Sequence, residues 1–457
     1  MFHTILIANR GEIALRVIRA CREMGIRSVI VYSEADKDSL PVRLADECIC
    51  IGPGQSSKSY LNIPNIISAA VLSQADAIHP GYGFLSENIS FSEICKDMNI
   101  AFIGPSARAM AIMSDKVSAR RAMAQAGLPM LPGTSVLRTL SAALEAVKDV
   151  GFPLMLKAVA GGGGRGIRLV NKQEEFERAF LLAQNEAREA FRDDGIYLER
   201  YLARARHIEI QVLLDHFGHG VHLGERNCSC QRRNQKVLEE APSPLLSPEL
   251  RNEMGMKAVQ AVQAVGYHNA GTLEFLVDEQ DRYYFMEMNT RMQVEHPVTE
   301  QVTNLDLVKE QIRIAAGQPL LLQQQDIQFR NHAIECRITA EDAEADFRPQ
   351  TGTVTQYIAP GGPGVRVDSY MYTGYEVPPH YDSLLAKLIV WGNTRDEAIE
   401  KARRALDEFI IEGLPTTIPF LKRLLEHPGF VSGETYTRFI QEEAIALGLE
   451  KPLLKIV

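Results

Sequence analysis

The feature that most constrains the fold is a regular alternation of short apolar strands and helices in the first hundred residues. Strand-like segments at 4–8, 28–32, 76–79 and 101–103 are separated by helical segments, the first of them amphipathic at 11–24. This alternation predicts a doubly wound parallel sheet, because parallel neighbours are joined by helical crossovers. Ligands bind such sheets at the carboxyl ends of the strands, where Asn9-Arg10-Gly11-Glu12 and His79-Pro80-Gly81-Tyr82-Gly83 fall.

The rest of the chain predicts two further regions. After a turn-rich joint at 128–133, residues 131–203 form a small unit with strands at 154–158, 167–170 and 196–200 and a charged helix. An antiparallel region follows, with strands at 207–213, 220–224, 271–277 and 282–288 and helices at 248–265 and 306–317. A third α+β region runs from 333 to 445. A chain of 457 residues exceeds one compact core, so we expect about three domains.

Charge and cysteine usage exclude several classes of protein. A net charge of −9 argues against a general nucleic-acid or anionic-membrane binder, which would carry a basic surplus. We find neither a signal peptide nor an apolar run of about 18 residues. An odd count of seven cysteines is typical of a reducing compartment, and the two C-x-C pairs match no common zinc spacing. We therefore expect a cytoplasmic protein, or one of an equivalent organelle interior after processing.

A glycine run follows Lys157 and ends at Gly166. It matches the dinucleotide pattern G-x-G-x-x-G literally at Gly161, Gly163 and Gly166. That pattern requires a helix after the glycines, whereas residues 167–170 predict a strand, and no Walker A ending is present. A glycine-rich hairpin that folds over phosphates fits better, with the ammonium of Lys157 able to reach a phosphate oxygen. The alternative is a flexible surface loop.

A pair of acidic strands predicts a metal site. If a turn at 278–281 closes a hairpin, Glu274 lies nearly opposite Glu287, and Asn289 shares a face with Glu287. Facing carboxylates are unfavourable without a cation between them, and this set of oxygen ligands suits Mg²⁺. Acidic residues on a solvated strand are the alternative.

Beyond those strands, Arg291, Gln293 and Glu295 alternate, so in an extended segment they project the same way. An arginine can hold a small anion while a neighbouring carboxylate accepts its proton. The same spacing occurs at His207 and Glu209. Exposed charged strands are the alternative, and the basic stretch 225–236 is equally compatible with an anion site or a plain surface.

These motifs, in this order, closely resemble biotin carboxylases, which are ATP-grasp enzymes. The resemblance covers nearly the whole chain and is carried by residues 7–14, 79–88, 157–166, 231–236 and 335–342, and most specifically by Glu287-Met-Asn-Thr-Arg-Met-Gln-Val-Glu-His-Pro-Val-Thr299. It implies an α/β and α+β chain with an ATP-grasp fold. The domains it implies are a Rossmann-like (pre-ATP-grasp) domain at 1–112, an ATP-grasp domain at 113–332 with a mobile lid at 131–203, a C-terminal α+β domain at 333–446 and a tail at 447–457.

The resemblance also implies a reaction in two stages. Bicarbonate attacks the γ-phosphate of ATP to give carboxyphosphate, which releases CO₂ beside biotin. The ureido nitrogen of biotin, deprotonated by the released phosphate, then attacks CO₂.

Motif position assigns roles to individual residues by the same resemblance. Magnesium or manganese, about two ions, would be held by Glu274, Glu287 and Asn289. Bicarbonate would be surrounded by Lys236, Arg291, Gln293 and Val294, with Glu295 as its base. Arg337 would stabilise the biotin enolate, and Tyr82 would lie near the biotin ring. The implied ATP contacts are Lys116, Lys157, Gly163, Gly164, Glu199, Arg200, Leu202, His207, Gln231, Glu274 and Glu287.

The sequence also bears on partners. No Ala-Met-Lys-Met biotinylation motif occurs, so we expect biotin on a separate carrier protein and transfer by separate carboxyltransferase subunits. Homodimers are common in the family, although Pro363 replaces a bulky apolar residue at that contact. Acetyl-CoA carboxylase is the expected assembly. A pyruvate, 2-oxoglutarate or acyl-CoA carboxylase would use the same half-reaction.

Two other readings are weaker. A non-catalytic nucleotide-binding regulator should have lost some of Lys236, Arg291, Glu295 and Arg337, and all four are present. An ATP-grasp enzyme of purine or peptide ligation gives no reason for the strings at 79–88 and 287–299. One departure from the family is Asn234, which stands where a histidine is frequent, so we place no nucleotide contact on it.

Overall fold

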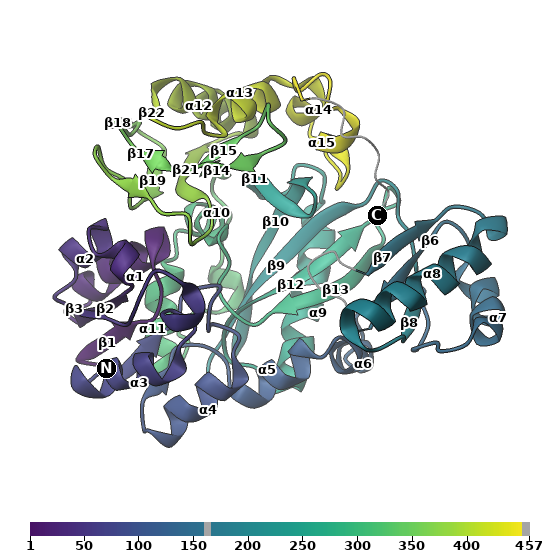
Figure 1. Cartoon of the computed structure of the whole chain (residues 1–457), viewed down its shortest axis with the longest axis horizontal. Coiled ribbons are helices and arrows are strands. Elements are labelled where there is room, and N and C mark those ends of the chain that lie inside the picture. Colours follow the sequence, from purple (N-terminus) through teal and green to yellow (C-terminus); the bar gives the residue numbers. More distant parts are fainter. Residues whose placement is uncertain (160–165, 450–457) are drawn as a thin grey trace.

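The computed structural model describes residues 1–159 and 166–449. Its N-terminal part is a sheet of five parallel strands in the order β3-β2-β1-β4-β5 (Figure 1), as the alternation predicts. Ile5 and Ile7 face one hydrophobic core and Leu6 faces another, because strand side chains alternate and helices cover both faces. The elements are β1 (Thr4–Ile7), α1 (Gly11–Glu23), β2 (Arg27–Tyr32), α2 (Leu40–Leu44), β3 (Glu47–Cys50), α3 (Ile63–Leu72), β4 (Ala77–His79), α4 (Ile89–Asp97) and β5 (Ala101–Phe102).

The loop after β4 is held by the end of β1. Asn9 Nδ2 donates to the backbone oxygens of Pro80 and Tyr82, at 2.7 and 2.8 Å. Gly81 has φ of +61°, a conformation that glycine adopts without steric cost. Tyr82 is thereby fixed at the carboxyl edge of the sheet.

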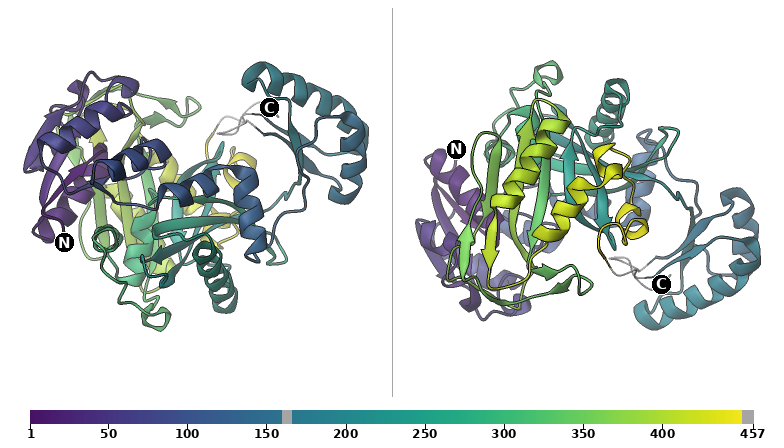
Figure 2. Two further views of the ribbon diagram at one scale, coloured as in Figure 1. Left: turned by 90° about the horizontal axis from the view of Figure 1, so that it is seen from below. Right: turned by 90° about the horizontal axis from the view of Figure 1, so that it is seen from above.

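Helices α5 (Ala107–Ser114) and α6 (Lys116–Gln125) lead to a small unit that projects from the main body (Figure 2). Its antiparallel sheet has the order β7-β6-β8, and α7 and α8 pack against it. Strands β6 and β7 pair directly, so the predicted hairpin is confirmed, while its tip with Gly163 and Gly164 lies outside the described residues. Closure of residues 131–203 over nucleotide stays a prediction. The elements are α7 (Leu140–Val150), β6 (Leu154–Ala158), β7 (Ile167–Val170), α8 (Gln173–Phe191) and β8 (Ile196–Arg200).

An eight-stranded antiparallel sheet forms the centre, in the order β13-β12-β9-β10-β11-β14-β21-β19. Strands from the C-terminal part of the chain extend the sheet formed by residues 206–289, so distant parts of the chain share one surface. Its strands are β9 (Arg206–Leu214), β10 (Gly220–Arg232), β11 (Gln235–Ala241), β12 (Asn269–Val277), β13 (Tyr283–Asn289), β14 (His332–Thr339), β19 (Val365–Ser369) and β21 (Leu384–Gly392).

One expectation from the sequence needs correction. The strand predicted at 220–224 continues to Arg232, and the basic stretch 225–236 is the β10–β11 hairpin. Residues 225–231 are buried, so the plain-surface alternative is wrong for most of this stretch. The two charged side chains among residues 225–231 are buried because each has a partner of opposite charge: Arg226 pairs with Glu209 on β9, and Glu225 pairs with Arg251 on α9 (Pro248–Ala264).

Helices cover this sheet and close its cores. Helix α9 packs against β9 and β10, while α12 and α13 pack over β14 and β21. Within residues 1–159 and 166–449, no helix is long and apolar enough to cross a lipid bilayer. The remaining elements are α9 (Pro248–Ala264), α10 (His296–Thr303), α11 (Leu307–Ala315), β15 (Glu341–Asp342), β16 (Arg348–Pro349), β17 (Gly352–Thr353), β18 (Gln356–Ile358), β20 (Glu376–Val377), α12 (Arg395–Glu408), β22 (Ile410–Glu412), α13 (Ile418–Glu426), α14 (Pro428–Val431) and α15 (Phe439–Glu442).

Candidate active site

The β12–β13 hairpin places the predicted metal ligands together. Glu274 and Glu287 are register partners, as the turn at 278–281 predicts. Asn289 Nδ2 donates to Glu274 Oε1 at 2.7 Å. Desolvation and then the charge of Glu274 raise the pKa of Glu287, although its side chain reaches the solvent-exposed surface. Two carboxylates and an amide in this arrangement suit a hard cation such as Mg²⁺.

A pocket opens beside this hairpin and brings in a third predicted residue. Its volume is 260 Å³, and Lys116, at the start of α6, lines it together with Glu287 and Asn289. A cation, a carboxylate and an amide around one hollow provide groups for a phosphate and for its metal ion. The other lining residues are Glu87, Met113, Ser114, Ala119, Met286, Met288 and Thr290.

Lys236, on β11, lies at the centre of a buried acidic cluster. Its Nζ donates to Glu295 Oε1 at 2.8 Å and to Glu274 Oε1 at 3.3 Å, and it contacts Glu209 closely. Burial lowers the pKa of this ammonium, but the three carboxylates outweigh burial and raise it well above its usual value. Lys236 is therefore charged at neutral pH, and its ammonium bridges Glu274 of the metal face to the predicted base, Glu295.

His207 and Glu209 border the same cluster. His207 Nε2 lies 3.1 Å from Glu274 Oε2 and 3.3 Å from Glu209 Oε1. Burial lowers the pKa of His207, but Glu274 and Glu209 raise it overall to about 9. Burial likewise opposes ionisation of Glu209, yet Lys236 lowers its pKa to about 2. At neutral pH the cluster therefore contains positively charged His207 and Lys236 beside negatively charged Glu209.

Arg226, on β10, is the functional residue that the sequence analysis missed. Its guanidinium is fully buried and donates to Gln293 Oε1 at 2.5 Å and to Gln211 Oε1 at 2.8 Å. Gln293 Nε2 in turn donates to Glu274 Oε1 at 2.8 Å. Arg226 thereby fixes the amide of Gln293 in the cluster. The sequence did not indicate this role, because the stretch 225–236 that contains Arg226 fits an exposed surface strand equally well.

The segment from Arg291 to Glu295 is not the extended row expected from its alternation. It bends and turns before α10, because backbone N–H groups of His296 and Val298 donate to the oxygens of Gln293 and Glu295. The side chains of Arg291, Gln293 and Glu295 nevertheless all reach the group of residues around Glu274, Asn289 and Lys236. Arg291 Nη2 donates to Asn289 Oδ1 at 3.0 Å, and its Nε donates to Glu87 Oε2 at 2.9 Å.

The predicted biotin residues come from two other elements. Arg337, on β14, donates from Nη2 to Glu295 Oε2 at 3.0 Å and from Nε to Glu239 Oε1 at 2.6 Å. Burial and these carboxylates act in opposite directions on Arg337, and the carboxylates raise its pKa. Tyr82 donates from its hydroxyl to Glu12. The structure gives no direct contact between the described side chains of Tyr82 and Arg337.

The predicted nucleotide contacts line the joint with the small unit. Lys157 pairs with Glu199, which also accepts from Arg120 Nη1 at 2.7 Å. Burial, and then Glu199, raise the pKa of Tyr197, on β8, to about 12. Two other members follow Glu199 in the chain: Arg200, whose backbone N–H donates to the oxygen of Pro132 at 2.8 Å, and half-buried Leu202. Gln231 lies on β10, where its Nε2 is 3.4 Å from His207 Nδ1.

Two other groups of side chains have ligand atoms within 4.8 Å of one another. One is His207, Glu209 and Glu274, and the other is Glu209, Cys228 and Glu295. Magnesium prefers oxygen to imidazole or thiol, which favours the Glu274–Glu287–Asn289 set for that ion.

All seven cysteines are free thiols, and Cys48 and Cys50 are exposed. Burial raises the pKa of the Cys228 thiol well above its usual value.

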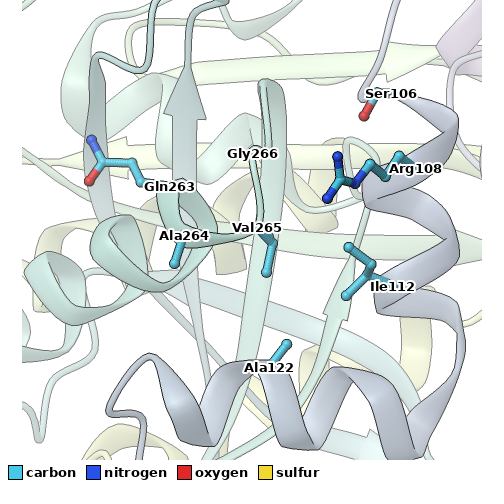
Figure 3. Close-up of a pocket in the computed structure, with 8 residues that line it drawn as sticks. All are labelled: Ser106, Arg108, Ile112, Ala122, Gln263, Ala264, Val265 and Gly266. Atoms are coloured by element: carbon cyan, nitrogen blue, oxygen red, sulfur yellow. The ribbon is translucent and has the colours of Figure 1, made fainter.

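A second pocket lies away from this cluster, where the ends of α5, α6 and α9 meet (Figure 3). Arg108 extends toward Val265 and Gly266 at the end of α9, and Ile112 and Ala122 supply apolar lining. None of the predicted site residues lines this second pocket, whereas Lys116, Glu287 and Asn289 line the first.

The projecting unit with its β6–β7 hairpin, the facing carboxylates on the central sheet and a pocket lined by Lys116, Glu287 and Asn289 together define an ATP-grasp ligase. Comparisons with known proteins agree. Residues 1–110 match the family described as biotin carboxylase, N-terminal domain, residues 115–323 match the ATP-binding domain of the carbamoyl-phosphate synthase L chain, and residues 335–442 match the biotin carboxylase C-terminal domain.

Individual relatives are similar over their whole lengths. A biotin carboxylase from Nostoc sp. is 58% identical over 96% of this chain and 99% of its own. The structure of a biotin carboxylase–β,γ-ATP complex from Campylobacter jejuni has 49% identity and a TM-score of 0.92, covering 97% and 99% of the two chains. The biotin carboxylase domain dimer of Hydrogenobacter thermophilus 2-oxoglutarate carboxylase, with MgADP, ADP and bicarbonate, has 47% identity and a TM-score of 0.91, covering 98% and 99%.

The chain therefore belongs to the biotin carboxylase family. It is an ATP-dependent ligase that catalyses the carboxylation of biotin, the first half-reaction of biotin-dependent carboxylases.

Proposed function

We propose that this protein carboxylates biotin through carboxyphosphate, with Glu295 as the base that activates bicarbonate. In this mechanism Glu295 accepts the bicarbonate proton while Lys236 and Arg291 hold the anion beside the γ-phosphate. The bicarbonate oxygen forms a bond to phosphorus and ADP leaves. Carboxyphosphate then breaks into CO₂ and phosphate, and the biotin nitrogen, after losing its proton to that phosphate, attacks CO₂.

One observation carries the proposal: Lys236 joins Glu274 of the metal face to Glu295, which Arg337 contacts from the other side. The residues that we propose to bind the phosphate, the bicarbonate and the biotin therefore follow one another in a single network of hydrogen bonds. Cations lie where negative charge develops during phosphoryl and carboxyl transfer, which is the electrostatic arrangement that lowers such barriers.

ATP and the metal ion belong to the same proposal. Glu274, Glu287 and Asn289 would hold Mg²⁺ or Mn²⁺, which would neutralise the phosphate charge. Lys116, Lys157 and His207 would contact the nucleotide, and residues 131–203 would close over it. Two related solved structures contain ATP-type nucleotides, and one of them also contains magnesium and bicarbonate.

We further propose that biotin arrives on a separate carrier protein and that the protein serves acetyl-CoA carboxylase as a homodimer in the cytoplasm. The similarity to the biotin carboxylase of Nostoc sp., 99% of which this chain covers, supports a carboxylase subunit separate from the carrier protein. Service in a 2-oxoglutarate carboxylase is the second candidate, because that enzyme's biotin carboxylase domain matches nearly the full chain and is a dimer.

The proposal predicts ATP hydrolysis that depends on bicarbonate and is stimulated by free biotin. Purified protein, Mg²⁺ and ATP are assayed for ADP release with and without added bicarbonate in CO₂-free buffer. We expect hydrolysis to rise with bicarbonate and to rise again with biotin. Hydrolysis that is indifferent to bicarbonate would contradict the proposal.

A further inference from the structure

A buried ion pair between Glu12 and Lys387 lies behind the proposed active site. Lys387 is on β21 and Glu12 is in the first turn of α1, and their side chains are 0% and 2% exposed. Lys387 Nζ lies 3.1 Å from Glu12 Oε1. The pair joins the N-terminal sheet region to the C-terminal strands.

On one side, the pair reaches the bicarbonate-binding segment. Lys387 Nζ donates to the backbone oxygen of Val294 at 2.9 Å. Val294 lies between Gln293 and Glu295, so this bond fixes the backbone that carries the proposed base. Lys387 is also the register partner of Arg337 on β14, so the two side chains project side by side from the same face of the sheet.

On the other side, the pair reaches Tyr82. The Glu12 oxygen that faces Lys387 also accepts the hydroxyl of Tyr82, and Lys387 Nζ lies 5.8 Å from the Tyr82 ring centroid. Among the described residues, Glu12 Oε2 has no hydrogen-bond partner. The carboxylate is therefore held mainly by the two groups that it links.

A buried ion pair such as Glu12–Lys387 contributes little net free energy to the contact between the N-terminal and C-terminal regions. Desolvating two charges consumes much of their attraction, and a well-packed apolar pair is often at least as stabilising. Other charged groups near Lys387 are Glu335 and Asp368, which attract it, and Arg366, which repels it. Both oxygens of Glu335 are buried and have no hydrogen-bond partner among the described residues.

We propose that Glu12 and Lys387 are positioning residues that couple biotin binding at Tyr82 to bicarbonate activation at Val294–Glu295. A shift of the Tyr82 hydroxyl moves the carboxylate of Glu12, and the ammonium of Lys387 transmits that change to the Val294 carbonyl. This inference rests on the proposed function and adds a path by which biotin stimulates the first step.

The test compares Glu12→Gln and Lys387→Met with wild type in the bicarbonate-dependent ATPase assay over a range of free biotin. We expect the half-saturating biotin concentration to rise about tenfold in both variants, within the range of a typical coupling between sites, while the biotin-free rate of Glu12→Gln stays within about threefold. The stimulation ratio should fall toward one. Glu225→Gln is the matched control, because Glu225 forms a buried pair with Arg251 at 2.5 Å outside the cluster, and its biotin response should be unchanged.

A double-mutant cycle adds a test that does not need Lys387→Met to fold. Tyr82→Phe removes the hydrogen bond to Glu12, and Glu12→Gln weakens it by removing the charge of the acceptor, so the effects of the two changes should be less than additive. Fully additive effects would overturn the inference. So would variants whose rates with and without biotin fall by one common factor at an unchanged half-saturating concentration, since that is the result of a purely structural pair. Wild-type hydrolysis that ignores bicarbonate would instead overturn the proposed function and this inference together.

Discussion

Glu295→Gln is expected to lower bicarbonate-dependent turnover by about 10²–10⁴-fold, the usual contribution of a general base. The amide keeps the size of the side chain but cannot accept a proton from bicarbonate. Lys236 and Arg337 hold the Glu295 carboxylate ionised, because their charges outweigh burial and lower its pKa. The variant should still bind ATP, since Glu295 contacts none of the proposed nucleotide ligands except through Lys236.

Turnover is measured at saturating ATP and bicarbonate, and nucleotide affinity by fluorescence titration. The control is Glu240→Gln, another buried carboxylate of the same sheet, which pairs with Arg395 at 2.7 Å and His332 at 2.8 Å. It should keep turnover within a few-fold of wild type even if it lowers stability. Unchanged turnover in Glu295→Gln would remove this residue from the base role.

The second large effect is expected for Lys236→Met in metal-free buffer with chelator. Three buried carboxylates, Glu209, Glu274 and Glu295, would lose their shared cation. Leaving such charges unpaired costs about 3–5 kcal/mol of folding free energy, and bicarbonate-dependent hydrolysis should be lost as well. Denaturant unfolding in the metal-free buffer measures the first effect, and the ATPase assay, run separately with Mg²⁺, measures the second. Lys257→Met, which removes an exposed pair with Glu253 at 2.9 Å, should cost only about 0–1 kcal/mol.

The stability deficit of Lys236→Met should depend on pH with a definite sign. In wild type the pKa of Glu209 is about 2, below the ordinary value of 4.5, so its ionised form stabilises the fold above pH 4.5 and this contribution is lost as pH falls toward 2. Without the ammonium, burial instead favours protonated carboxylates. The deficit relative to wild type should therefore shrink as the pH falls from about 8 to about 5. A deficit that is constant over this range would show that Lys236 acts mainly by packing.

Local patterns predicted much of this site. The facing of Glu274 and Glu287 followed from a hairpin turn and the two-residue period of strands, and the β6–β7 hairpin followed from glycines placed between two apolar runs. Both are short-range properties, so the sequence specifies them directly. The roles of individual residues came from the resemblance to a family, and they stay predictions that the variants above test.

Long-range features were not predictable in the same way. Arg226 lies in a charged stretch whose burial depends on β9, β11 and α10, which approach it from elsewhere in the chain. The contact of Lys387 with Glu12 spans nearly the entire sequence, and no periodicity signals it. The bend before α10 likewise depends on the packing of Gln293 and Glu295 into the cluster, which overrides their alternation.

The most direct test of the account follows one oxygen atom. If bicarbonate attacks the γ-phosphate, bicarbonate labelled with ¹⁸O must leave one labelled oxygen in the phosphate released by each turnover. The assay uses a short reaction, before bicarbonate exchanges with water, and mass spectrometry of the phosphate. We predict phosphate carrying ¹⁸O from bicarbonate in wild type. Phosphate whose new oxygen comes only from water would contradict the carboxyphosphate mechanism.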